Sequence, residues 1–486
     1  MSKKSSNKSY IPDHHKMLRP QAEHLNRVLD SVPCRPADRR LYGHLVTSYK
    51  LQACSHPAGI PVPYDTIRRH IPGANAFRLK DILEISEHWS GHCREYRPLD
   101  SVMMEHLAIS ARMSAWEIMS TDVVDFDSGR KMNRAPRSRL VDYNNHPLPP
   151  LVRATIEKLK ANRAYVMLAD LEQRYQSLAA DLLARGESVE PNEKRRFRNN
   201  TSCREHLLRH PMEYHGDGLY SYIPAHIARN TGRLYALGGC LQSISRDLKR
   251  ASLIDVPGFR NYDVKSCQVF IAMRLLEQAG IDARPLIDYL DKADPKAFYG
   301  DALGIPGDDA KQMVIALNMG ALLPKSVNRW QQRDNSILDT LAKFSVDEAE
   351  LKSLLARTWD VLGPMSECLR KWHTHLLEEY IPAHKVRGGK GFVLYNAVRM
   401  PLRLWELRLT HPRFRWVDVA RVAAHLLQGL EQACIQEQIV RDDQCKVFDI
   451  DHDGFHVTEG EADQGLWVDI TTKYRLAGLR LEEKPL

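Results

Sequence analysis

The fold is decided by Val447-Phe448-Asp449-Ile450-Asp451-His452-Asp453-Gly454-Phe455-His456-Val457. Two strand-like runs flank an Asp-Gly pair, which is the strongest short-range signal for a β-hairpin. The turn of this hairpin should project His452 and Asp453 together, within a β-rich segment from Val447 to Ile470. The same aspartates match the first half of a calcium-binding loop, but Gly460 stands where that loop requires a bidentate glutamate. The hairpin is therefore the stronger interpretation and the calcium loop the weaker.

A second aspartate lies in Asn261-Tyr262-Asp263-Val264-Lys265-Ser266-Cys267-Gln268, which opens into an apolar helix, Val269 to Leu276. An aspartate at the end of a strand can hold a hard cation beside a phosphate, although a helix N-cap or a turn is the better interpretation of Asp263 in isolation. After it the chain is rich in helices from Cys267 to Leu407, and a further helix is predicted from Val417 to Val440. Strands on either side of a helical insertion predict one sheet assembled from both ends of this segment.

Two further stretches carry residues suited to phosphates and bases. Asn230-Thr231-Gly232-Arg233-Leu234-Tyr235 is followed by Leu241-Gln242-Ser243-Ile244 and by the basic residues Arg246, Lys249 and Arg250. Glycine lets the backbone approach a ligand closely, and arginine side chains suit phosphates and base edges. The other stretch, Asp308 to Gly320, predicts a helix with acidic residues at its start and glycine at its end. One face of that helix offers an ammonium to a triphosphate and an apolar shelf to a base, through Lys311, Ile315, Asn318 and Met319.

The two aspartates can carry the chemistry of nucleotide joining. Asp263 and Asp453 can together hold two divalent ions, one activating a 3′-hydroxyl and one neutralising the leaving pyrophosphate. Catalysis is then mainly positioning and charge stabilisation, with Lys311 adding positive charge at the phosphates. The ions themselves would keep the aspartates ionised. We expect Mg²⁺ as the cofactor, as two ions, with Mn²⁺ able to replace it.

Composition excludes several classes of protein. Of the 486 residues, 43% are hydrophobic and 27% charged, as in a folded protein large enough for roughly two to four subdomains. The formal charge of +8 and the basic run Lys194 to Arg198 make a nucleic-acid partner plausible. Nine cysteines without a Cys-x-x-Cys pair predict reduced, buried thiols. The polar, basic N-terminal residues and the lack of a long apolar run predict a cytoplasmic protein without a membrane anchor.

Two other groups of potential metal ligands are weaker. Cys203, His206 and His210 lack a fourth zinc ligand. Asp170 and Glu172 form the Asp-x-Glu that begins the metal site of a proofreading exonuclease, but the helical spacing of the apolar residues around them makes them a surface feature. We therefore expect neither a zinc site nor an exonuclease.

Taken in order, the four stretches resemble the motifs of family A DNA polymerases and of the related phage-type single-subunit RNA polymerases. The resemblance covers Tyr214 to about Val457, and it implies an α+β, right-hand polymerase fold with a palm sheet between helical fingers and thumb. The implied division of the chain is an N-terminal helical domain (1–150), thumb (151–225), first part of the palm (226–275), fingers (276–407) and second part of the palm (408–486).

The resemblance implies a role for each matching residue. Asp263 and Asp453 correspond to the metal-binding aspartates, and Lys311 to the lysine on the triphosphate. The remaining nucleotide contacts would be Ile315, Met319, Gly320 and Gln268. Nucleic acid would contact Arg233, Gln242, Arg246, Lys249, Gln428 and His452. The partners implied are a DNA template and primer, nucleoside triphosphates, and a helicase or small accessory protein.

Three positions depart from the family's pattern. Gly307 stands where the family usually has an arginine, so Lys325 or Arg329 would have to help bind the triphosphate. Met319 replaces the aromatic residue before the helix-ending glycine, which puts fidelity in doubt. Gln268 replaces the glutamate that blocks a ribose 2′-hydroxyl in DNA polymerases, which leaves the choice of sugar open.

We expect a family A-like DNA polymerase without proofreading. A primase or single-subunit RNA polymerase is the alternative within the same chemistry, distinguished by incorporation of ribonucleotides and by independence from a primer. The alternative of another class is a non-catalytic nucleic-acid-binding protein on a polymerase scaffold, against which the presence of both aspartates argues.

Overall fold

The computed structural model describes residues 15–52, 60–62, 64–86, 94–134, 137–138, 140–141, 146–327, 336–388, 390–411, 415–451 and 453–486. Most of its secondary structure is helical, and the strands form small antiparallel sheets. Within these ranges, no helix combines the length and the apolar character that a membrane crossing requires.

The first part of the chain mixes helices with short strands, although the sequence predicted helices alone. The helices are α1 (Arg19–Asp30), α2 (Pro36–Gln52), α3 (Tyr64–His70), α4 (Asp100–Ala111) and α5 (Ala115–Ser120). β1 (Lys16–Leu18) pairs with β5 (Val123–Asp125), and β4 (Glu95–Pro98) lies between β2 (Ile60–Pro61) and β3 (Leu83–Ile85). Strands of two to four residues are too short to show an alternating pattern in the sequence.

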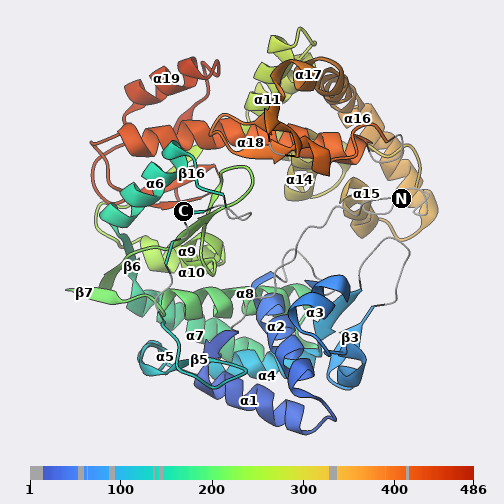
Figure 1. Cartoon of the computed structure of the whole chain (residues 1–486). Coiled ribbons are helices and arrows are strands. Elements are labelled where there is room, and N and C mark those ends of the chain that lie inside the picture. Colours follow the sequence, from blue (N-terminus) through green and yellow to red (C-terminus); the bar gives the residue numbers. More distant parts are fainter. Residues whose placement is uncertain are drawn as a thin grey trace.

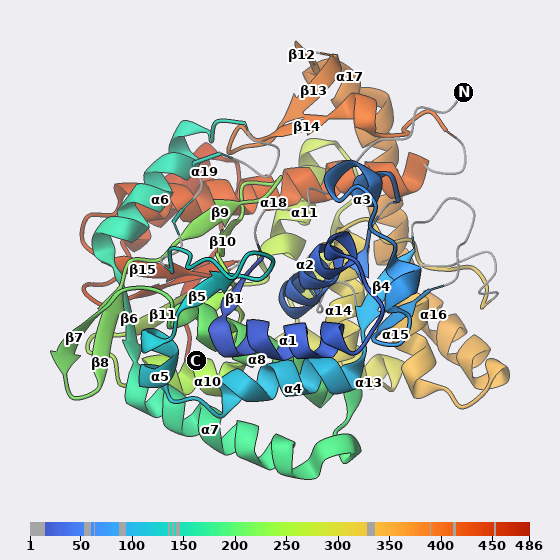
Figure 2. The same cartoon turned by 60° about the horizontal axis from the view of Figure 1, so that its bottom comes forward.

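The second part of the chain packs against the first. Its helices are α6 (Pro150–Asn162), α7 (Leu168–Arg185), α8 (Pro191–Leu207), α9 (Cys240–Ser243) and α10 (Arg246–Leu253). Its strands are β6 (Ala164–Met167), β7 (Met212–Gly216) and β8 (Leu219–Tyr222), in the order β6-β8-β7, and the pair β9 (His226–Ala228) and β10 (Leu234–Ala236). Figures 1 and 2 show α1, α2 and α4 grouped with α7 and α8.

The sheet that positions the two aspartates is assembled from distant segments, as the sequence predicted. Its order is β15 (Val447–Ile450), β16 (Gly454–Val457), β11 (Arg260–Val264) and β17 (Leu481–Glu483), and all neighbours are antiparallel. β15 and β16 form the hairpin expected around Asp-Gly. Helix α11 (Cys267–Gln278) follows β11, and helix α18 (Arg415–Arg441) runs across the molecule above the sheet (Figure 1).

The prediction of β structure up to Ile470 was wrong beyond the hairpin, because α19 (Gln464–Lys473) occupies the end of that segment. The side chain of Asp463 caps this helix by accepting a hydrogen bond from the backbone of Leu466. Trp467 and Ile470 are buried and lie three residues apart, which places them on one face of a helix. The helix therefore forms because its apolar residues follow a helical rather than an alternating period.

The middle of the chain contains α12 (Arg284–Leu290), α13 (Pro295–Leu303), α14 (Gly307–Asn318), α15 (Ser336–Leu341), α16 (Glu348–His375) and α17 (Ile381–His384). The sequence predicted these helices but not the sheet of β12 (Val386–Gly388), β13 (Gly391–Tyr395) and β14 (Pro401–Arg403) that follows them. One continuous core of buried apolar side chains joins this region to α11, α18 and the aspartate-bearing sheet. The sheet and the middle helices therefore form one packed body.

Candidate active site

The structure brings Asp263 and Asp453 together. Asp263 lies near the end of β11, and its partner across the sheet is Gly454, the first residue of β16. The backbone N–H of Val264 donates a hydrogen bond to the carbonyl of Asp453 at 2.8 Å. Asp263 therefore lies on β11 and Asp453 in the turn just before β16, where the two segments are joined by this hydrogen bond.

Glycine at position 454 is required by the close approach of β11. A Cβ atom added to Gly454 would lie 2.1 Å from the carbonyl oxygen of Tyr262, a distance that no side chain tolerates. The sequence predicted a turn glycine here, but the structure shows that the requirement comes from the neighbouring strand. Any side chain at this position would push apart the strands that carry the two aspartates.

The electrostatics of the pair suit a cation. Burial, followed by the charges of Asp263 and Glu431, raises the pKa of Asp453 to about 7. The ammonium of Lys484, just after β17, contacts the carboxylate of Asp263. Among the described residues, no three His, Cys, Asp or Glu side chains gather into a metal-binding cluster. A divalent ion at this place would be held by the two aspartates, whose hard carboxylate oxygens suit Mg²⁺, and at Asp263 it would replace the Lys484 ammonium.

A buried carboxylate that the sequence analysis missed lies beside this pair. Glu431 of α18 is fully buried and accepts two hydrogen bonds from Arg233, both at 2.8 Å. It also accepts one from the side-chain amide of Gln268 at 3.2 Å. Arg233 and Gln268, which the resemblance assigned to nucleic acid and nucleotide, thus have an intramolecular partner, and only 11% of the Arg233 side chain is exposed.

One signal in the sequence could have revealed Glu431. It falls between Leu427 and Ile435 at intervals of four residues, so it lies on the apolar face of the predicted helix. A glutamate at such a position is buried only if a cation or several donors satisfy it. That pattern predicts a buried partner but cannot identify Arg233.

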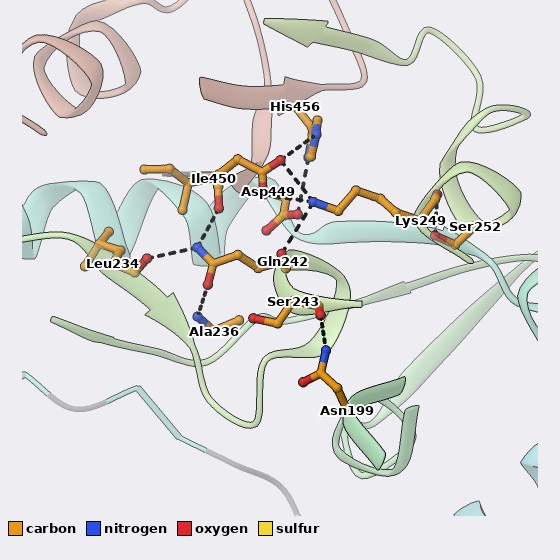
Figure 3. A network of polar contacts seen from close by, with 11 residues as sticks. Asn199, Leu234, Ala236, Gln242, Ser243, Lys249, Ser252, Asp449, Ile450 and His456 are labelled. Carbon is orange, nitrogen blue, oxygen red and sulfur yellow. Dashed lines mark hydrogen bonds and ion pairs between the residues drawn. The ribbon is translucent and has the colours of Figure 1, made fainter. Parts of the chain in front are cut away.

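Gln242 and Lys249, also predicted to contact nucleic acid, are likewise engaged within the chain (Figure 3). The amide of Gln242 donates to the carbonyls of Leu234 at 2.9 Å and Ile450 at 2.7 Å, and it accepts from the backbone of Ala236 at 2.9 Å. The ammonium of Lys249 lies 2.9 and 3.0 Å from the two carboxylate oxygens of Asp451. Both side chains therefore hold the hairpin strand β15 and its turn.

The predicted nucleotide-binding residues lie on α14 and beside α18. Lys311 is exposed, and Ile315 and Met319 are half-buried. The Met319 sulfur lies 3.8 Å from the side-chain nitrogen of Gln428, so these two candidates are in contact. Gly320 has a φ of +95°, and a Cβ there would lie 2.4 Å from the Cβ of Ala420 on α18. Gly320 is therefore required for the packing of the end of α14 against α18, independently of any contact with a nucleotide.

Several remaining candidates can be placed individually. Lys325 is exposed and lines a cavity of about 940 Å³ among residues 325–359, none of which belongs to the aspartate pair. His452 and Arg329 lie outside the described residues. Glu172 is held by Arg204, whose guanidinium donates to it at 2.7 Å, so this glutamate has a structural role in α7.

A basic cleft lies between α8 and the start of α10. Its volume is about 560 Å³, and its lining comprises Asn192, Arg195, Arg196, Asn199, Asn200, Ser245, Arg246 and Asp247. Arg195, Arg196 and Arg246 are exposed, and none of them forms an ion pair with a described residue. Three unpaired guanidinium groups beside several amides make this cleft suited to phosphates.

Neither a protein-family model nor the sequence of a curated protein matches the chain. Among solved structures, the chain is similar to the POL domain of Pol1 from M. smegmatis in complex with DNA primer-template and dNTP, with 13% sequence identity and a TM-score of 0.39. The match covers 79% of this chain and 65% of that one, so the chain spans less than two thirds of the length of the chain it matches.

Proposed function

We propose that the protein is a template-directed nucleotidyltransferase that joins nucleotides to a 3′-hydroxyl. The observation that carries the proposal is the meeting of Asp263, on β11, with Asp453, in the turn that precedes β16. Two carboxylates at this spacing in the fold can hold Mg²⁺, which, when bound, would activate the hydroxyl and neutralise the leaving pyrophosphate. In this arrangement the sheet β15-β16-β11-β17 and α11 would belong to the palm, α12 to α17 would form the fingers, and α6 to α8 the thumb.

The side chains of the protein contribute positioning and charge. Asp263 and Asp453 would supply the oxygen ligands, and burial of Asp453 would exclude water from one side of the site. Lys311, exposed on α14, would hold the triphosphate. The basic cleft at Arg195, Arg196 and Arg246 would follow the phosphates of the template or primer.

We further propose DNA synthesis on a DNA template and primer, with no proofreading exonuclease. The engagement of Gln268 by Glu431 leaves its amide oxygen without a hydrogen-bond partner among the described atoms, so the choice between deoxyribose and ribose depends on how this side chain is held. A primase or single-subunit RNA polymerase is the second candidate. Gln268 favours it, because this residue stands where DNA polymerases have the glutamate that blocks a ribose 2′-hydroxyl.

Primer extension tests the proposal. A labelled DNA primer on a DNA template is incubated with Mg²⁺ and either dNTPs or NTPs, with a lane without primer and the Asp453→Ala protein as control. Extension with dNTPs and primer alone is the expected result. Products from NTPs or without primer would establish the primase or RNA polymerase. No product with either metal, Mg²⁺ or Mn²⁺, would favour a non-catalytic nucleic-acid-binding protein.

A further inference from the structure

Asp453 is carried by a short turn whose position depends on contacts around Asp451. Within the turn, the backbone N–H of Asp451 donates to the carbonyl of Gly454 at 3.0 Å. On one side, β11 holds the carbonyl of Asp453 through Val264. On the other side, among the described residues, Gln242 holds the carbonyl of Ile450 and Lys249 holds the carboxylate of Asp451.

Lys249 of α10 holds that carboxylate. Its ammonium lies 2.9 and 3.0 Å from the two oxygens of Asp451 and 3.5 Å from the carbonyl of Gln242. Only 11% of the Lys249 side chain is exposed, against 32% for Asp451. The Lys249 ammonium is therefore engaged within the chain, whereas Arg246 and Arg250 on the same helix are exposed.

Buried His456 of β16 lies beside the same carboxylate. Its Nδ1 atom is 3.3 Å from Asp449, its cross-strand partner, and its Nε2 atom is 3.6 Å from Asp451 without a hydrogen bond to a described residue (Figure 3). Gln242 of α9 ties the preceding carbonyl, that of Ile450, to β10. The ion pair with Lys249 of α10 is therefore the contact that fixes the Asp451 carboxylate among the described residues.

From this geometry we propose that Lys249 is a positioning residue for the site, fixing the turn that carries Asp453 through its ion pair with Asp451. This inference rests on the proposed function of Asp453. Its physical basis is that a displacement of about 1 Å at a reacting group can lower a rate about 100-fold. Residues that orient metal ligands typically change metal affinity or activity by about 10–100-fold when they are replaced.

The test compares Lys249→Met with Lys249→Arg, Asp451→Asn and the double variant Lys249→Met/Asp451→Asn. The control is Lys446→Met, which removes the ammonium of an ion pair with Glu459 whose two side chains are 54% and 60% exposed. Three quantities are measured: the rate of primer extension, the affinity for primer-template, and the affinity for Mn²⁺ in the absence of nucleic acid, followed by electron paramagnetic resonance.

Lys249→Met should slow extension and weaken Mn²⁺ binding, each by about tenfold or more, while primer-template affinity stays unchanged. Lys249→Arg should retain most of both properties, and the double variant should be no worse than Lys249→Met, because the pair acts as one unit. Lys446→Met should leave Mn²⁺ binding and the extension rate as they are. Thermal unfolding shows whether Lys249→Met loses activity because it is unfolded. If it is, the extension rate and Mn²⁺ affinity of Asp451→Asn are compared with those of Lys249→Arg instead.

Three results would overturn the inference. Wild-type Mn²⁺ affinity and extension rate in Lys249→Met would show that the ion pair does not position Asp453. Weaker primer-template binding with an unchanged rate and a smaller salt dependence would make Lys249 a phosphate contact instead. Wild-type protein that neither extends a primer nor binds Mn²⁺ through Asp453 would refute the proposed function, and the inference with it.

Discussion

Removing one partner of the buried ion pair between Arg233 and Glu431 should be strongly destabilising, which gives a sharp test. Glu431 has no exposed side-chain surface and Arg233 has 11%. Replacing Glu431 by Ala therefore leaves a guanidinium buried without its counter-charge, which typically costs about 3–5 kcal/mol. Arg233→Met leaves the carboxylate buried and should cost a similar amount.

Replacing both partners should cost less than either single change. The double variant Arg233→Met/Glu431→Leu removes both charges. The side-chain amides of Gln268 and Gln432, each 3.2 Å from Glu431, then lose the hydrogen bonds that they donate to this carboxylate. An unsatisfied buried polar group costs about 1–3 kcal/mol. We expect the free energy of unfolding of the double variant to lie between wild type and the single variants.

Urea unfolding followed by circular dichroism measures these differences. Glu437→Ala is a matched control, because Glu437 lies on the same helix and is 9% exposed, while its partner Lys473 is 56% exposed. Water can solvate the ammonium left behind, so this change should cost less than Glu431→Ala. A loss below about 1 kcal/mol in Glu431→Ala, or a double variant as unstable as the sum of the singles, would refute the reasoning. If Arg233→Met were as stable as the wild type but bound primer-template more weakly, Arg233 would be a nucleic-acid contact, as the resemblance implies.

Three further changes test the sheet, the nucleotide and the nucleic acid. Gly454→Ala places a Cβ 2.1 Å from the carbonyl oxygen of Tyr262. We expect a loss of stability of about 1–3 kcal/mol in thermal unfolding and no product in the extension assay. Lys311→Ala should raise the apparent KM for the nucleotide about tenfold or more, because a hydrogen bond to a charged group is worth about 1.5–3 kcal/mol; an unchanged KM would remove Lys311 from the site. Replacing Arg195 and Arg196 by Gln should weaken primer-template binding and lower its salt slope by about 1 to 2, and an unchanged slope would place the phosphates elsewhere.

Local signals predicted much of the secondary structure around the site. The Asp-Gly pair predicted the hairpin of β15 and β16, and the acidic start and glycine end of residues 308–320 predicted α14, observed as Gly307–Asn318. The helix predicted from Val417 to Val440 is observed as Arg415–Arg441. Each of these signals acts over a few residues, where periodicity and capping decide the conformation.

Burial of charged residues could not be predicted in the same way. Lys249, Arg233 and Gln242 read in the sequence as basic or polar residues next to a glycine turn, which is equally typical of a nucleic-acid contact. Their partners, Asp451, Glu431 and the carbonyl of Ile450, lie about two hundred residues further along the chain, at separations of 202, 198 and 208. Only packing of the two halves of the chain removes these side chains from water.

The sequence by itself determined which chemical groups are present and which local elements carry them: an aspartate at the end of a strand, an aspartate in a hairpin turn, and a lysine on a helix. Tertiary structure decided that Asp263 meets Asp453, that Glu431 stands beside them, and that Lys249 turns inward while Arg246 remains in a solvent-filled cleft. The reason is physical. Hydrogen bonds and periodicity within a helix or hairpin depend on neighbours along the chain, whereas desolvation and ion pairing depend on whichever distant segment closes over a side chain.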